Sequence, residues 1–455
     1  MVKQSFKGGI HPPEKKELCR DRITERVYPS SNTVYIPVTQ GGSPNSPVVA
    51  PGDIVKKGQI IAKSDSFMSV PVHASISGTV KKITNVLTTG NIDRQVIVIE
   101  GNPDEKEKFL SKSEEAFLPV IDPFKCPKEA ALERIKQAGI AGMGGASFPT
   151  HVKLNPPKDK TIDTVIANAA ECEPYLTIDE RTLLENANQV VDGIAIEMEI
   201  LNAQKGIIAL EDNKEDLLPY LEKAIAKSSA GKYISVVLCK TKYPQGGEKM
   251  LVKAVLKREI PTKGLPADAG CLIQNVGTLK AVSDAFRKGQ PLITRSLTVS
   301  GEQCSNPKNI EVPVGTLVGD LIPEYITLLP GVYKIISGGP MMGFSMESAG
   351  FPVQKNTSGV LFLGKYDCTV SQESYCIGCG RCVKHCPCSL PPVLMMRSLD
   401  GGNLEKAQKL GLMDCMECGA CSYVCPASIK LVQRFKTGKD IIREKMRKMN
   451  NKEKK

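Results

Sequence analysis

The chain has 455 residues, of which 41% are hydrophobic and 24% charged, so a wholly disordered or fibrous protein is excluded. At about 150 residues per domain, this length predicts about three domains. The net charge is +11, from 60 basic and 49 acidic residues, but aromatic residues make up only 5% and no nucleic-acid recognition motif is present, so we expect no nucleic acid among the partners.

The chain carries no sequence signal for crossing a membrane. Its longest apolar stretches, such as residues 360–363, are far shorter than the roughly 18 to 20 residues of a spanning helix. The N-terminal residues MVKQSFKGGIHPP lack the apolar segment of a secretory signal. We therefore expect a cytosolic chain with reduced thiols, whose 16 cysteines need a use other than disulfides.

Short β segments broken by glycine and proline fill residues 34–100 and predict an all-β unit. Two half-motifs, PGDIVKKGQIIA and VPVHASISGTVKKI, resemble the interlocking halves of the barrel-sandwich hybrid in lipoyl and biotinyl domains. Those carriers present a modifiable lysine at a hairpin tip, where this chain has Ser-Phe-Met-Ser, so no swinging arm is expected. We assign residues 1–105 to an N-terminal segment and this barrel, and residues 103–115 to a linker.

Helices and apolar strands then alternate from residue 125 to residue 290, which predicts a Rossmann-like α/β domain with a largely parallel sheet. Residues 291–345 return to short strands with one short helix, as in a small α+β unit. The expected fold class is therefore multidomain, α/β and α+β, followed by the cysteine-rich segment.

Eight cysteines form two copies of the spacing C-x2-C-x2-C-x3-C-P, in residues 376–387 and 415–426. The spacing is typical of bacterial ferredoxins with two [4Fe–4S] clusters, in which the fourth cysteine of each run ligates the cluster of the other run. Residues 366–435 are thus predicted to be a two-cluster ferredoxin-like domain. A pair of structural zinc sites is the alternative. The expected ligands are Cys376, Cys379, Cys382 and Cys425 for one cluster, and Cys415, Cys418, Cys421 and Cys386 for the other.

Two features of this region fall outside the motif. Cys388 has no place among the eight ligands, and we expect a spare thiol packed near a cluster. Residues 436–455 are rich in lysine and arginine, and we expect a solvated, frayed tail. A short basic amphipathic helix, with Ile442, Met446 and Met449 on one face, is the alternative.

A glycine-rich loop follows the first predicted helix of the α/β domain and contains Gly142, Gly144 and Gly145. It lacks the third glycine of G-x-G-x-x-G, so it is no ordinary dinucleotide fingerprint. Glycines still let the backbone approach a planar or phosphorylated ligand, and Lys153 can meet a phosphate. A purely structural loop is the alternative.

Three later segments, residues 168–174, 243–249 and 274–279, complete a pattern. With the glycine loop and in the same order, they resemble the flavin and NADH site of the 51 kDa subunit of respiratory complex I, over roughly residues 130–345. The resemblance implies that Phe148 and Glu248 act in catalysis, Phe148 stacking on the nicotinamide side and Glu248 lying near the dinucleotide with Glu173. It implies that FMN is surrounded by Gly142, Gly144, Gly145, Lys153, Asn168, Glu171, Tyr243, Asn275 and Thr278.

Three positions depart from that family. Ala170 stands where the family has an aspartate, Gly247 replaces the first of two glutamates, and Leu265 matches an aromatic residue that helps to clamp the adenine. These departures imply weaker or altered dinucleotide affinity.

Over the whole chain, the N-terminal FKGGIHPPEKK, the barrel, the SGGPMMG turn at residues 337–343 and the paired ferredoxin runs resemble the RnfC family of the Rnf complex. That family is the peripheral, cytoplasmic-side component of a membrane-bound ferredoxin:NAD oxidoreductase that pumps sodium ions or protons. The resemblance implies FMN, two [4Fe–4S] clusters, NAD(H) as substrate, integral membrane subunits as partners and ferredoxin as an indirect donor. It also implies that the α+β unit is a soluble-ligand-binding β-grasp (SLBB) domain.

Two other functions use the same parts. One is a soluble electron carrier, such as a cobalamin reductase or a protein that serves an amino acid reductase. The other is an electron-transfer module without a working nucleotide site, which the departures at Ala170, Gly247 and Leu265 keep open.

Overall fold

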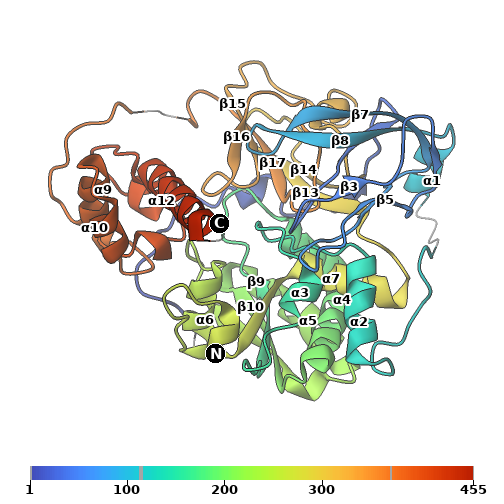
Figure 1. The fold of residues 1–455 in the computed structure, drawn as a ribbon, viewed down its shortest axis with the longest axis horizontal. Coiled ribbons are helices and arrows are strands. Elements are labelled where there is room, and N and C mark those ends of the chain that lie inside the picture. The colour runs from blue at the N-terminus through green and yellow to red at the C-terminus, as the bar shows by residue number, and fades with distance from the viewer. Residues whose placement is uncertain (1–2, 112–115, 369–370, 454–455) are drawn as a thin grey trace.

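The computed structural model describes residues 3–111, 116–368 and 371–453. It arranges them in four units (Figure 1): two β-rich units, an α/β unit below them, and a helical C-terminal unit to one side, drawn in red. The multidomain α/β fold expected from the sequence is confirmed. None of the helices in these ranges is long and apolar enough to cross a membrane.

The first unit is the all-β barrel that the sequence predicts. Its two sheets have the orders β2-β8-β7-β4 and β3-β5-β6 and enclose a core of valine and isoleucine side chains. The strands are β2 (Thr33–Pro37), β3 (Ser46–Pro47), β4 (Ile54–Val55), β5 (Ile60–Lys63), β6 (Val72–His73), β7 (Gly78–Thr88) and β8 (Ile92–Gly101).

The expected linker 103–115 is not a simple linker. Its first part forms helix α1 (Glu105–Leu110), and Phe109 inserts into the barrel core, where its side chain is 2% exposed. The buried aromatic ring ties this helix to the barrel. Residues 112–115, the end of the expected linker, lie outside the described residues.

The α/β unit contains one parallel sheet of order β11-β10-β9-β12. Successive strand residues face opposite sides: Val165 and Ala167 pack in the core under α2, α4, α5 and α7, whereas Ile166 packs against α6. The elements are α2 (Lys128–Gln137), α3 (Thr150–Lys153), β9 (Thr164–Ala169), α4 (Ile178–Leu201), β10 (Lys205–Glu211), α5 (Leu218–Lys227), β11 (Ile234–Cys239), α6 (Glu248–Leu256), β12 (Cys271–Asn275) and α7 (Val276–Arg287).

The sheet of the second β-rich unit extends beyond the expected range 291–345. Its order is β1-β14-β13-β17-β15-β16, so the N-terminal strand β1 pairs with one edge and β17, which is buried along its whole length, lies in the middle. The expected short helix is a 3-10 turn at Val318–Leu321. The strands are β1 (Thr24–Arg26), β13 (Thr294–Ser300), β14 (Lys308–Pro313), β15 (Lys334–Ser337), β16 (Phe344–Met346) and β17 (Gly359–Leu363).

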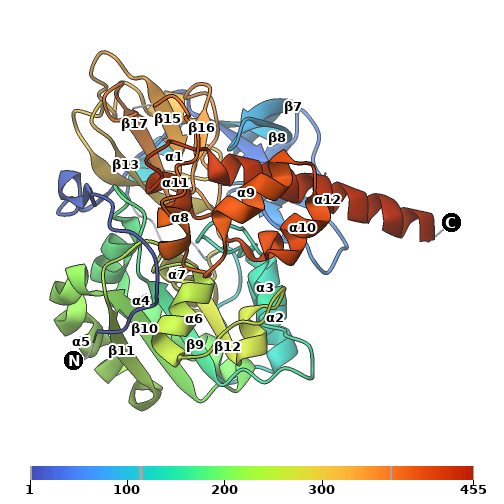
Figure 2. The same ribbon diagram turned by 90° about the vertical axis from the view of Figure 1, so that its left-hand side faces the viewer.

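The C-terminal unit consists of short helices around the cysteine runs and one long helix, which projects from the molecule in Figure 2. The long helix includes the segment expected to be a frayed tail. Ile442 packs in the core of this unit and so holds that part of the helix, whereas Met446 and Met449 are exposed. The helices are α8 (Arg381–Lys384), α9 (Pro392–Asp400), α10 (Leu404–Lys409), α11 (Ala420–Tyr423) and α12 (Leu431–Glu453).

Candidate functional site

Two cavities in the C-terminal unit are each lined by four cysteines of the repeated spacing. The first is lined by Cys386, Cys415, Cys418 and Cys421. The second is lined by Cys376, Cys379, Cys382 and Cys425. The structure therefore brings the fourth cysteine of each run to the first three of the other run, which is the crossed grouping that the spacing predicts.

The local fold explains how the runs cross. Helices α8 and α11 each begin after a glycine with positive φ, Gly380 and Gly419, and the two helices contact one another. Each helix therefore carries the cysteine that follows it to the loop of its neighbour. Burial raises the pKa of the Cys418 thiol to about 12, so a cation must lie close by for this thiol to become a thiolate. Four thiols around each cavity are the donor set of a [4Fe–4S] cluster.

Two residues beside the first cavity carry further information. Cys388 lines the cavity without belonging to the group of four, as expected for a spare thiol. Lys439, which the sequence placed in a solvated tail, is 4% exposed and donates to Glu417 at 2.7 Å and to the carbonyl oxygen of Cys415. Its spacing to Phe435 and Ile442, at i, i+4 and i+7 on α12, could have predicted this buried face.

In the α/β unit, polar residues gather at the carboxyl ends of β9 and β12. Asn275 is the last residue of β12 and Asn168 is the last but one of β9, and the two lie opposite one another in the register. From β9 the chain continues to β10 and β11, which lie on one side of β9 within the sheet, whereas β12 lies on its other side. The boundary between β9 and β12 is therefore the topological switch point of the sheet. Ligands of open α/β sheets bind at such points.

The glycine loop lies against the same place. Gly142 donates to the carbonyl oxygen of Phe148 at 2.9 Å, which closes the loop, and the amide of Met143 donates to Thr278 Oγ1 at 3.0 Å. A Cβ on Gly144 would be 3.4 Å from Asn275, and one on Gly145 would meet no atom within 4 Å. The loop thus presents bare backbone to open space beside the N-terminus of α7, which suits a planar, phosphorylated group such as FMN.

Lys153 and Glu248 are neighbours at this edge. Lys153 Nζ donates to Glu248 Oε1 at 2.8 Å and to the carbonyl oxygen of Ile273 at 2.5 Å. The structure brings together the residue expected to contact phosphate and the residue expected near the dinucleotide. Phe148, at the end of the glycine loop, is 40% exposed, and Leu265, in place of the adenine-clamping aromatic residue, is 67% exposed.

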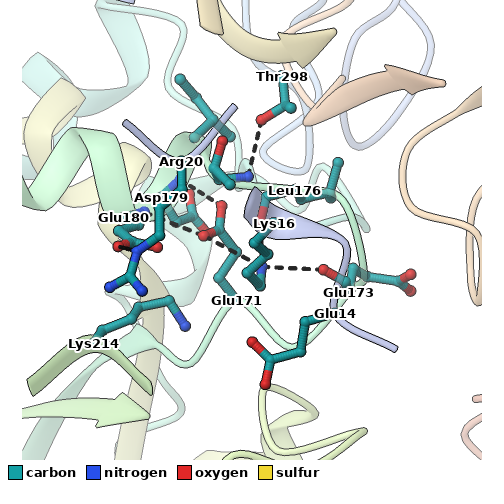
Figure 3. A network of polar contacts seen from close by, with 12 residues as sticks. Glu14, Lys16, Arg20, Glu171, Glu173, Leu176, Asp179, Glu180, Lys214 and Thr298 are labelled. Atoms are coloured by element: carbon teal, nitrogen blue, oxygen red, sulfur yellow. Dashed lines mark hydrogen bonds and ion pairs between the residues drawn. The ribbon is translucent and has the colours of Figure 1, made fainter. Parts of the chain in front are cut away.

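Glu171 lies in a network of polar contacts with Lys16, Asp179 and Glu180 (Figure 3). It accepts the amides of Asp179 and Glu180 at 2.7 and 3.3 Å, where its charge complements the N-terminus of α4. Lys16, from the N-terminal segment, lies 3.7 Å from it and donates to the carbonyl oxygen of Glu173 at 3.2 Å. The acidic motif is therefore held in place by a residue far away in sequence.

Glu173 connects this motif to the turn at residues 337–343. Its carboxylate accepts the amides of Met341 and Met342 at 3.0 and 2.9 Å. Burial raises the pKa of Glu173 to about 7. The motif thus contacts the SGGPMMG turn, whose Met341 packs in turn against the loop of the first cysteine cavity.

The segment 243–248 contacts the first cysteine cavity directly. Tyr243 is 1% exposed, and its hydroxyl donates to the carbonyl oxygen of Cys418 at 2.7 Å. A Cβ on Gly247 would be 2.3 Å from Cε of Met416. A side chain at position 247 would therefore displace the end of the flexible Met416 side chain.

Sequence reasoning missed three polar residues near the flavin motifs, namely Asp179, Arg295 and Gln245. Asn275 Nδ2 donates to Asp179 Oδ2 at 2.7 Å, and burial, with Glu171 nearby, raises the pKa of Asp179 to about 7. The buried Arg295 lies near Asp179, and burial lowers the pKa of Arg295 to about 10. The side-chain amide of Gln245 is buried and has no hydrogen-bond partner among the described residues, as expected beside a bound polar group. Single residues of this kind have no local pattern that reveals burial.

Known protein families match three parts of the chain. The Nuo51 FMN-binding domain matches residues 135–284, the RnfC barrel sandwich hybrid domain matches residues 4–105, and the 4Fe-4S dicluster domain matches residues 368–426. The last match favours clusters over the zinc alternative. A flavin-binding domain joined to a dicluster domain defines an electron-transfer protein of the iron–sulfur flavoprotein class.

Whole-chain relatives define the family. The RnfC-type component of the "proton-translocating ferredoxin:NAD(+) oxidoreductase complex" of Clostridium ljungdahlii is 46% identical, over 94% of this chain and 92% of its own length. Its counterpart in the "Na(+)-translocating" complex of Acetobacterium woodii is 39% identical, over 98% and 99%. The counterpart in the "ion-translocating oxidoreductase complex" of Rhodobacter capsulatus is 36% identical, over 97% and 84%. The chain belongs to this family, the RnfC components of the ion-translocating ferredoxin:NAD oxidoreductase (Rnf) complexes.

Proposed function

We propose that this chain is the NAD(H)-reacting subunit of a membrane-bound, ion-translocating ferredoxin:NAD oxidoreductase, and that it passes electrons between NAD(H) and the membrane subunits. Bound FMN supplies the conversion between the two-electron hydride of NAD(H) and the single electrons that clusters carry. The observation that carries the proposal is the 2.7 Å contact of Tyr243 with Cys418, because it joins the flavin motifs to a cysteine cavity.

The residues of the α/β unit would divide the work of holding the cofactor. The bare backbone at Gly142, Gly144 and Gly145 would lie against the flavin, and the N-terminus of α7 with Lys153 would receive its phosphate. Asn168, which donates to the carbonyl oxygen of Gly246 at 2.7 Å, would fix the segment 243–248 beside it. Phe148 would cover the nicotinamide and orient it. Hydride transfer requires no more of the protein than this orientation.

The contact also supports an order of electron carriers. The cavity of Cys386, Cys415, Cys418 and Cys421 adjoins Tyr243 and Met416 at the α/β unit, whereas Cys379 of the other cavity is exposed. Electrons would pass from the flavin to the first cluster, then to the second, and leave from there toward a partner subunit.

Rapid mixing of the FMN- and iron-loaded protein with NADH tests the function. We expect the flavin absorbance to bleach first and the clusters to become reduced afterwards. A flavin that NADH does not reduce would instead favour an electron-transfer module without a working nucleotide site. Retention of the protein in the soluble fraction, even with its membrane partners present, would favour a soluble carrier.

Lys153 and Glu248 are expected to affect different steps. Lys153→Ala should weaken FMN retention by about 1.5 to 3 kcal/mol, because it removes a charged hydrogen-bond donor to the phosphate. Glu248→Ala should leave FMN bound but slow its reduction by NADH. Equilibrium dialysis of FMN and rapid mixing measure the two effects. The exposed Lys158 and Glu222 provide matched controls as alanine variants. Unchanged flavin content in the first variant and an unchanged rate in the second would remove both residues from the site.

We also propose a peripheral location on the cytoplasmic side of the membrane, held by integral partner subunits. The last thirteen residues contain seven basic and two acidic side chains, and each basic residue near anionic lipid adds only roughly 1 kcal/mol, which salt screens. Deletion of residues 443–455 should therefore leave the protein in the membrane fraction when its partners are present. Tight binding of the isolated full-length chain to protein-free anionic liposomes at physiological salt would contradict this location.

A further inference from the structure

Residues 4–10, here called the N-terminal strap, lie outside the barrel that follows them in sequence. The amide of Gln4 donates to the carbonyl oxygen of Leu238 at 2.8 Å, and the amide of Lys240 donates back to Gln4 at 2.8 Å. The strap thus begins as a parallel extension of the edge strand β11. In Figure 2 it is the dark blue trace that runs from this edge up toward α8.

One side of the strap is bonded to the segment that carries the flavin motif. Ile10 donates to the carbonyl oxygen of Tyr243 at 2.8 Å and accepts the amide of Tyr243 at 2.9 Å. Its side chain is 3% exposed and packs in one apolar cluster with Tyr243, Cys418 and Ala420. Ile10 therefore contacts both the α/β unit and the loop of the first cysteine cavity.

The other side of the strap is bonded to the turn that carries Cys386. The amide of Gly9 donates to the carbonyl oxygen of His385 at 2.9 Å. A Cβ on Gly8 would lie 2.7 Å from the carbonyl oxygen of Cys386 and 3.0 Å from its carbonyl carbon. Backbone therefore meets backbone here, and no flexible side chain can move aside.

Both glycines are required by conformation as well as by space. Gly8 and Gly9 have φ of +83° and +78°, which other residues adopt only with strain. A Cβ on Gly9 would be 2.7 Å from the carbonyl oxygen of Tyr243. Phe6 anchors the start of the strap, since Lys242 donates to its carbonyl oxygen at 2.8 Å and lies 4.4 Å from the centre of its ring.

We infer that the N-terminal strap is a positioning element that sets the separation between the flavin site and the first cluster, with Gly8 and Gly9 as its spacer. The inference rests on the proposed function. The strap is the only part of the described chain that hydrogen-bonds through its backbone to both Tyr243 and the His385–Cys386 turn. An added methyl group at Gly8 would push this turn, and Cys386 with it, away from the α/β unit.

The step concerned is electron transfer. NADH, oxidised FMN and one proton give NAD+ and reduced FMN, which then loses two electrons, one to each cluster, and releases two protons to water. Because electron transfer slows as donor and acceptor move apart, we expect Gly8→Ala to slow the second step severalfold.

The experiment uses the full chain loaded with FMN and iron and mixed rapidly with NADH. Gly8→Ala should leave flavin reduction unchanged, slow cluster reduction and speed amide hydrogen exchange at Gly9 and Ile10. Gly52→Ala is the matched control, because Gly52 also has a positive φ, +95°, but a Cβ there meets no atom within 4 Å. Cluster reduction at the unmodified rate in Gly8→Ala would overturn the inference.

Two further measurements keep the result decisive. If Gly8→Ala fails to hold iron, the milder Phe6→Ala, which loosens the anchor, should show the same selective slowing of cluster reduction. An unchanged rate of cluster reduction in that variant would overturn the inference.

Photoreduction of the bound flavin replaces NADH in a parallel run. Failure of NADH to reduce the flavin of the unmodified protein would then count against the proposed function alone, since the second step is still measured.

Discussion

Cys386→Ala should remove one of two iron–sulfur clusters and lower the iron content of the reconstituted protein from about eight atoms to about four. Cys386 lines the cavity of Cys415, Cys418 and Cys421, although it belongs to the other run in sequence. With the proposed first carrier gone, NADH should still reduce the flavin but not the remaining cluster. Iron analysis, electron paramagnetic resonance and rapid mixing measure these effects.

Double variants test the crossed grouping itself. Cys386→Ala combined with Cys421→Ala should lose no more iron than the single variant, because both residues line one cavity. Combined with Cys382→Ala, it should lose nearly all the iron, since Cys382 lines the other cavity. The reverse pattern would show that each run holds its own cluster. Cys388→Ala is the control and should retain both clusters.

Lys214→Met should destabilise the α/β unit by about 3 to 5 kcal/mol, because it leaves a buried carboxylate without its partner. Lys214 is fully buried and donates to Glu211 at 3.2 Å, to Asn213 at 3.0 Å and to the carbonyl oxygen of Ala170 at 3.0 Å. The last bond ties it to the motif of Glu171, so flavin retention should fall as well. Urea unfolding followed by circular dichroism measures the loss of stability.

A double-mutant cycle separates the ion pair from the packing. Glu211→Gln together with Lys214→Met should recover part of the lost stability, because the uncompensated charge is then absent. Lys223→Met, on the exposed face of α5, should change stability by less than about 0.5 kcal/mol. A double variant as unstable as Lys214→Met alone would mean that the charge on Glu211 contributes nothing to the effect.

Much of the fold follows from local patterns that the sequence displays. The strands β9 to β12 are apolar runs between amphipathic helices, a pattern that requires a parallel sheet covered on both faces. The cysteine runs have a spacing that only a few loop geometries allow, and their crossed grouping follows from it. The limits of such patterns are visible at α12, where the charged composition of residues 436–455 suggested a frayed end although Lys439 and Ile442 are buried.

The sequence by itself determined the types of unit, the order of the flavin motifs and the eight cysteines around the cavities, because each depends on residues close together in the chain. Only the tertiary structure decided how the units meet: Lys16 beside Glu171, Glu173 on the amides of Met341 and Met342, and Gly8 against Cys386. These contacts join residues more than 150 positions apart. They depend on the shapes of docked surfaces, and no periodicity or spacing encodes such shapes.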